Sequence, residues 1–69
     1  MPHSYSVLLA EPSLLLREKI AGVLARDKRV WSVTQVEGAE GLIRCAAIFK
    51  PDFILADLDV NQIFEIYAS

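Results

Sequence analysis

The chain has 69 residues, of which 54% are apolar, and a formal net charge of −2. A domain of this length buries only about 60% of the surface of its unfolded chain, yet its apolar fraction exceeds the roughly 45–50% of ordinary domains. So much apolar surface in so short a chain predicts an oligomer or a part of a larger unit. Acidic and basic residues are interspersed without a basic stripe, so no nucleic-acid interface is expected from this segment.

The same composition indicates the compartment. Cys45 is the only cysteine, which favours a reducing environment, and His3 is the only histidine, so no His and Cys set for zinc exists. The first residues lack the basic region and apolar run of a signal peptide. No stretch reaches the roughly 18 apolar residues of a membrane span. We therefore expect a cytoplasmic protein without membrane contact.

The first half of the chain predicts a strand, a helix and a second strand. The apolar run Tyr5–Ala10 is typical of a strand buried on both faces, and Pro12 turns the chain after it. A helix is expected from Leu14 to Asp27, with Gly22 allowing a close approach to the sheet. Val30–Glu37 is a more polar strand, as at a sheet edge. The apolar face predicted for the helix consists of Leu16, Ile20, Val23 and Leu24.

The second half predicts one more helix and one more strand. A helix is expected from Ala39 to Lys50, ended by Pro51. Asp52–Asp57 is again a continuous apolar run and is predicted to be a buried strand. Residues 61–69 fit either a helical turn or a short strand. The apolar face predicted for this helix consists of Leu42, Cys45, Ala46 and Phe49.

Alternating strands and helices predict an α/β fold with a parallel sheet and right-handed crossovers. The first and third strands are the most apolar, so we expect them to be neighbours, with the second strand outside the first. The predicted order is 2-1-3. We find no internal repeat and no linker, so residues 1–69 are interpreted as one partial βαβαβ domain.

Three acids follow the two most apolar strands: Glu11 after the first, and Asp57 and Asp59 after the third. Because parallel strands end at one edge, these side chains are expected to meet where open α/β sheets bind ligands. Clustered carboxylates attract a hard cation such as Mg²⁺, and a carboxylate can itself attack phosphorus. The alternative is that these acids cap helices and solvate loops.

The ordered pattern "VLLAEPSLLLREKI" followed by "FKPDFILADLDV" resembles the receiver domain of response regulators in bacterial two-component signalling. The match runs from about Val7 to Val60. The resemblance implies a flavodoxin-like fold, Asp57 as the phosphoacceptor, Glu11 as the first member of an acid pair, and Asp59 as the source of a backbone carbonyl for Mg²⁺. It also implies a sensor histidine kinase as partner and no enzymatic activity of its own.

The chain departs from the family pattern at informative positions. Pro12 stands where the family has its second acid, so a Mg²⁺ site of Glu11, Asp57 and Asp59 is expected to be weak or absent. Asn61 replaces a proline of the acceptor loop. The family continues with two strands and three helices that carry a phosphoryl-sensing Thr or Ser and a Lys, and no Lys or Arg follows Asp57 here. These functions are therefore not expected in cis.

Two classes of function remain open. The first is a phosphorylated receiver. The second is a degenerate receiver that serves as a phosphorylation-independent docking or dimerisation module. Because a third strand at the sheet edge exposes backbone groups and apolar surface, we expect a homodimer or larger assembly through that edge. The alternatives are exchange of the tail "NQIFEIYAS" between protomers, or a fragment that is kept soluble by a partner or only partly ordered. A nucleotide-binding half-domain fits poorly, because "AEPSLLLR" lacks the glycines of a phosphate-binding turn.

Overall fold

The computed structural model describes residues 4–57, and the predicted elements occur there in the predicted order. Their ends differ from the predicted ones by at most two residues. Asp59 and residues 61–69, for which predictions were made, lie outside the described residues. The elements are β1 (Tyr5–Ala10), α1 (Leu14–Ala25), β2 (Val30–Val36), α2 (Ala39–Phe49) and β3 (Phe53–Ala56).

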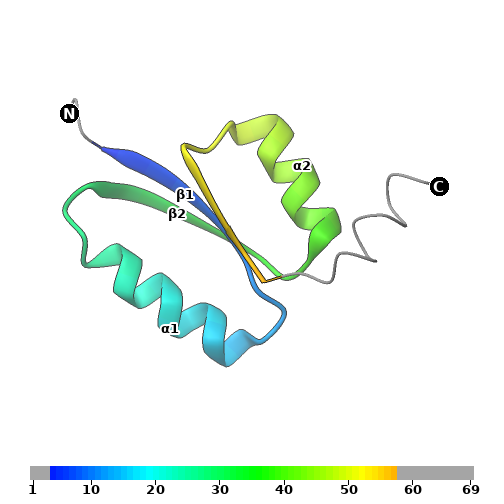
Figure 1. Cartoon of the computed structure of the whole chain (residues 1–69), viewed down its shortest axis with the longest axis horizontal. Helices are drawn as coiled ribbons and strands as arrows, with labels where there is room; N and C mark the ends of the chain where they lie inside the picture. The colour runs from blue at the N-terminus through cyan, green and yellow to red at the C-terminus, as the bar shows by residue number, and fades with distance from the viewer. Residues whose placement is uncertain (1–3, 58–69) are drawn as a thin grey trace.

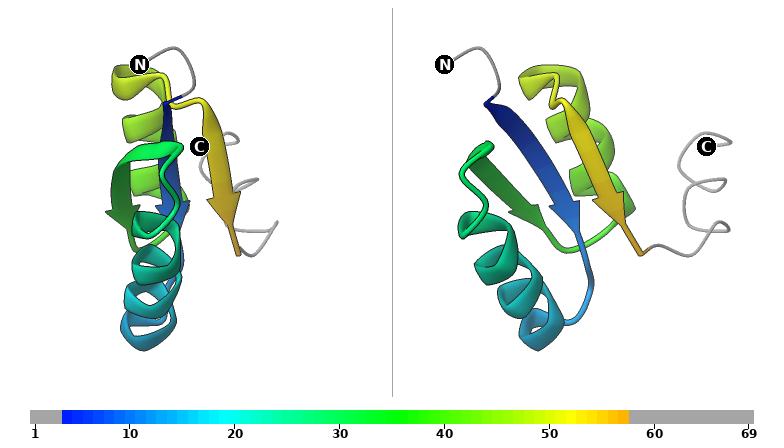
Figure 2. Two further views of the ribbon diagram at one scale, coloured as in Figure 1. Left: turned by 90° about the vertical axis from the view of Figure 1, so that its left-hand side faces the viewer. Right: turned by 60° about the vertical axis from the view of Figure 1, so that its left-hand side comes forward.

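The sheet is parallel and has the order β2-β1-β3, as predicted. The two helices lie on opposite sides of the sheet, α1 mainly over β2 and α2 over β1 (Figure 1). Turning the molecule shows β1 between the other two strands (Figure 2). The chain is thus an α/β unit of βαβαβ type. In residues 4–57, no helix is long and apolar enough to cross a membrane.

The core of the described chain is the central strand. Leu8 and Leu9 point to opposite faces of β1 and are each 1% exposed, so both faces are covered at this strand. Ala10 is fully buried, and Ala39 at the start of α2 is buried as well. A continuous apolar run on β1 therefore corresponds to a strand with helices on both sides.

Helix α1 begins at a serine cap and packs by a different face from the predicted one. The Ser13 hydroxyl accepts a hydrogen bond from the Leu16 backbone N–H, as a helix N-cap does. Leu16 and Val23, predicted to be inward, are 49% and 68% exposed. The half-buried residues of α1 recur at helical spacing: they are Arg17, Ile20, Ala21 and Leu24. The predicted apolar face of α1 is rotated about the helix axis by roughly one residue from the face that packs. Leu14, Leu15 and Leu16 are consecutive apolar residues, so the pattern at this end of the helix does not favour one face.

The close approach between helix and sheet also occurs at a different glycine. Gly22 is exposed, and a Cβ added there would meet nothing within 4 Å, so the predicted role of Gly22 is wrong. A Cβ on Gly41 would lie 3.1 Å from the Cβ of Val36. The first turn of α2 therefore passes against the end of β2 at Gly41.

The two edge strands differ in regularity and polarity. Strand β2 is half-buried and polar, as predicted, and its pairing with β1 shifts by one residue, because Tyr5 pairs with Val30 and Ser6 with Ser32. Strand β3 pairs with β1 without a shift. All four residues of β3 are exposed, so the prediction of a buried third strand is wrong within the described residues.

Candidate functional site at the carboxyl edge of the sheet

Two of the predicted site residues emerge side by side where β1 and β3 end. Ala10 and Ala56 are paired in the sheet, and Glu11 and Asp57 follow them directly. The Asp57 backbone N–H donates to the Ala10 carbonyl at 3.1 Å, which holds the two ends together. Neighbouring strands lie about 4.8 Å apart. The structure therefore places Glu11 and Asp57 at one edge, as predicted.

Glu11 is a buried carboxylate with local partners. It is 5% exposed, and its Oε1 accepts a hydrogen bond of 3.2 Å from the Ser13 N–H. Its own backbone N–H donates to the Val36 carbonyl at 3.1 Å, so Glu11 continues the pairing of β1 with β2. Glu11 thus orders the turn into α1 as well as lying at the sheet edge, but it is neither the helix cap, which is Ser13, nor a solvated loop residue, as the alternative interpretation expected.

Arg17 brings a positive charge to the same edge, which the sequence interpretation missed. Its Nη1 donates to the backbone carbonyl of Glu11, six positions earlier in the chain, at 2.9 Å. Arg17 is half-buried on the face of α1 that packs on the sheet. Its position four residues after the Ser13 cap was a usable signal, because the first turns of a helix that follows a parallel strand lie above the end of that strand.

Asp57 differs from Glu11 in being exposed to solvent. Its backbone is fixed by the bond to Ala10, while its side chain is open to a reagent in solution. A carboxylate that is exposed and held at the sheet edge beside a buried acid can act as a nucleophile toward phosphorus.

The described residues do not fit a magnesium site well. Pro12 offers no side-chain oxygen, and one oxygen of Glu11 already accepts a backbone hydrogen bond. In residues 4–57, no three His, Cys, Asp or Glu side chains are grouped so as to hold a metal ion. Asp59, the third predicted ligand, lies outside the described residues. Mg²⁺ usually needs a near-octahedral set of oxygens, which the described residues of this edge do not supply.

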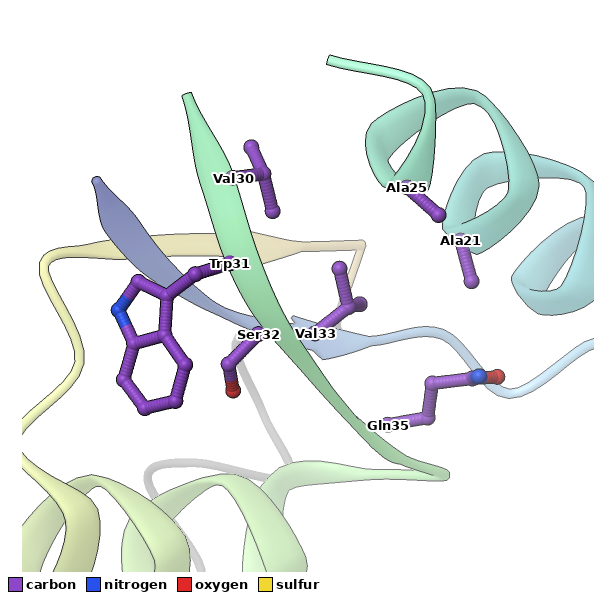
Figure 3. Close-up of a pocket in the computed structure, with 7 residues that line it drawn as sticks. All are labelled: Ala21, Ala25, Val30, Trp31, Ser32, Val33 and Gln35. Atoms are coloured by element: carbon purple, nitrogen blue, oxygen red, sulfur yellow. The ribbon is translucent and has the colours of Figure 1, made fainter. Parts of the chain in front are cut away.

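A hollow in the described part of the chain lies elsewhere. A groove of about 330 Å³ runs between α1 and the outer side of β2, where Ala21 and Ala25 leave space (Figure 3). Val33 and Gln35 point toward the helix, whereas Trp31 points to the other side of the sheet. The residues that line this groove carry no charge and include neither Glu11 nor Asp57. It offers no group for proton or phosphoryl transfer.

At the other end of the strands, where β1 and β3 begin, Asp52 has a structural role. Its Oδ2 accepts hydrogen bonds from the Ser6 N–H at 2.8 Å and from the Ser6 hydroxyl at 3.2 Å. The Asp52 N–H donates in turn to the Ser6 hydroxyl and carbonyl, at 3.1 and 3.0 Å. This reciprocal clamp ties the start of β3 to β1, which explains an acid placed just before an apolar strand.

Comparison with known proteins identifies no relative: no protein-family model matches the chain, and neither the curated proteins nor the solved structures contain a match. Topology and the local geometry at the carboxyl edge therefore carry the functional interpretation.

Proposed function

We propose that the chain is a receiver-like domain of a two-component signalling system that accepts a phosphoryl group on Asp57. The donor is a cytoplasmic sensor histidine kinase or a small acyl phosphate. The observation that carries the proposal is the exposed Asp57 carboxylate beside buried Glu11, at the carboxyl ends of adjacent parallel strands in the order 2-1-3. The sequence resemblance to receivers supports it independently.

The chemistry requires one nucleophilic displacement. An oxygen of the Asp57 carboxylate attacks phosphorus, a P–O bond forms, and the bond from phosphorus to the leaving group breaks with its electron pair. With acetyl phosphate the leaving group is acetate, and the product is an acyl phosphate on Asp57. Arg17, bonded to the Glu11 carbonyl, supplies positive charge at this edge and offsets the charge that the phosphoryl group adds.

Treatment with acetyl phosphate and Mg²⁺, followed by intact-mass and peptide mass spectrometry, tests the proposal. We expect the mass of one phosphoryl group on the peptide that contains Asp57, and none in Asp57→Asn. Pro12→Asp is the matched variant that restores a second carboxylate, and it is expected to be modified faster at the same Mg²⁺ concentration. An unmodified Asp57 in the unchanged chain would contradict the proposal, whether or not Pro12→Asp is modified.

A second candidate function is a docking or dimerisation module that does not need phosphorylation. It is favoured by β3, whose large side chains are exposed: Phe53 by 54%, Ile54 by 51% and Leu55 by 45%. Sheet edges with such surface pair readily with another chain. The acetyl phosphate treatment above separates the two candidates, because a module that acts without phosphorylation needs no adduct on Asp57, whereas assembly through β3 is expected of both.

A further inference from the structure

The outer edge of β3 is the regular, apolar edge of this sheet. Within residues 4–57, no strand pairs with its outer side. The other edge, β2, carries the register shift at Trp31 and the polar residues Ser32, Thr34 and Gln35. A bulge and polar side chains discourage edge pairing, and β3 has neither. If a strand is added to this sheet, β3 is therefore the edge that receives it.

The backbone groups that β3 offers can be assigned from its bonds to β1. Within the ladder, the Asp57 N–H donates to the Ala10 carbonyl. Because the N–H and C=O groups of successive strand residues alternate between the two sides of the strand, Leu55 and Phe53 also face β1. The groups of Ile54 and Ala56 then face outward. Each of these two residues offers one donor and one acceptor to a neighbouring chain.

Symmetry restricts how a second copy can pair with this edge. A two-fold axis perpendicular to the sheet makes the two β3 strands antiparallel and keeps each side chain on its own face. Directly opposite residues of an antiparallel pair share a face. Alternate residues of β3 lie on opposite faces, so a residue can oppose only itself or a residue an even number of positions away. The allowed registers are therefore each centred on a single residue.

Among these registers, the one centred on Ile54 matches the side chains best. It sets Ile54 against Ile54 of the second copy on the α2 side of the sheet, and Phe53 against Leu55 twice on the α1 side. A register centred on Leu55 would set Phe53 against Asp57, and one centred on Phe53 would set Ile54 against Asp52. Only the Ile54-centred register pairs the three large apolar residues of β3 solely with one another.

Charge and hydrogen bonding agree with this register. The outward groups of the two Ile54 residues exchange N–H···O bonds, so Ile54 forms a hydrogen-bonded pair, and Phe53 opposite Leu55 forms the closer, non-hydrogen-bonded pairs. The Asp52 carboxylate is turned toward β1 by Ser6 and does not add negative charge to the outer edge. In each copy Asp57 lies opposite Pro51, next to the basic residue Lys50 of the other copy. The paired edges are thus complementary at their ends as well as along their length.

We propose that a second copy of this chain pairs with β3 as an antiparallel strand centred on Ile54, making one continuous six-stranded sheet. The α1 helices of both copies lie over one face and the α2 helices over the other. This proposal rests on the docking function above and does not require phosphorylation of Asp57. The partner copy adds Lys50 near each Asp57, which supplies a cation to the carboxyl edge.

Disulfide cross-linking of single-cysteine variants in a Cys45→Ala background tests the register. Cα atoms of opposite residues in an antiparallel pair lie about 5.5 Å apart at hydrogen-bonded positions such as Ile54 and about 4.5 Å apart at the others, and both distances are within the range that a disulfide spans. We expect Ile54→Cys to form a covalent dimer under mild oxidation. Leu55→Cys should not, because it lies opposite Phe53 and not opposite itself. Sedimentation of the unmodified chain should show a dimer at micromolar concentration.

A mixture of Phe53→Cys and Leu55→Cys chains provides a second measurement, should Ile54→Cys fold poorly by circular dichroism. This mixture should cross-link, while each of its two components alone should not. Cross-linking of Leu55→Cys in preference to Ile54→Cys, equal cross-linking of both, or a folded monomer of the unmodified chain would each overturn the proposal. The outcome is separable from the phosphorylation test, which reads the mass of Asp57.

Discussion

At the scale of single residues, Asp27 illustrates how one carboxylate orders a turn. Its Oδ1 accepts hydrogen bonds from the Arg29 N–H at 2.9 Å and from Nε at 3.1 Å, and its Oδ2 accepts from Nη2 at 2.8 Å. These bonds close the connection between α1 and β2. The side-chain hydrogen bond with Arg29 is the main reason that the Asp27 pKa falls from 3.8 to about 2.

We expect Arg29→Gln to raise the pKa of Asp27 toward 3.8, as measured by NMR titration of the carboxyl carbon. Because the pKa of Asp27 is lower in the folded chain, its ionised form stabilises the fold above about pH 4, and that stabilisation is lost as the pH falls toward 2. The pair is exposed to solvent, so the effect on stability is small. Arg26→Gln is the control and should leave the Asp27 pKa where it is. An unchanged pKa in Arg29→Gln would contradict this account.

At the scale of the elements, the two glycines inside helices differ in what limits their replacement. At one only the low helix propensity of glycine matters, and at the other the packing of the helix on the sheet matters as well. Gly22 lies in α1 with open space around its Cα, whereas Gly41 lies in α2 against Val36. Glycine inside a helix costs about 1 kcal/mol relative to alanine. That penalty can be removed only where a methyl group fits.

We therefore expect Gly22→Ala to raise the free energy of unfolding by about 0.5–1 kcal/mol, by the usual helix preference. Gly41→Ala should lower it, because the new Cβ would lie 3.1 Å from the Val36 Cβ, an atom attached directly to the backbone of β2. Urea denaturation followed by circular dichroism measures both. Equal stabilisation by the two substitutions would show that α2 can move away from β2 at no cost.

At the scale of the whole molecule, β3 is attached to the rest of the sheet along one side and at one clamp. Ser6 and Asp52 are 46 positions apart in the chain, and they bond reciprocally at the start of the strand. The Phe53 ring packs edge-on against Tyr5, with centroids 5.2 Å apart. The attachment of β3 thus depends on contacts formed only when the two ends of the described chain meet.

Asp52→Ala should lower the free energy of unfolding by about 1 kcal/mol, because the Ser6 N–H and hydroxyl lose a charged acceptor. Hydrogen exchange should show earlier loss of protection in β3 than in the pairing of β1 with β2. Asp52→Asn is the matched control: it keeps an acceptor oxygen and should retain most of the stability. Equal losses in the two variants would rule out the hydrogen bonds as the cause.

Sequence patterns alone predict the order of elements, the parallel sheet with β1 at its centre, and the adjacency of Glu11 and Asp57. These features follow from apolar runs and from acids placed after them, which are local patterns. The packed face of α1, the glycine at the close approach and the Ser6–Asp52 clamp became known only from the fold. Each depends on which surfaces the neighbouring elements cover, and the spacing of residues along the chain does not encode that coverage.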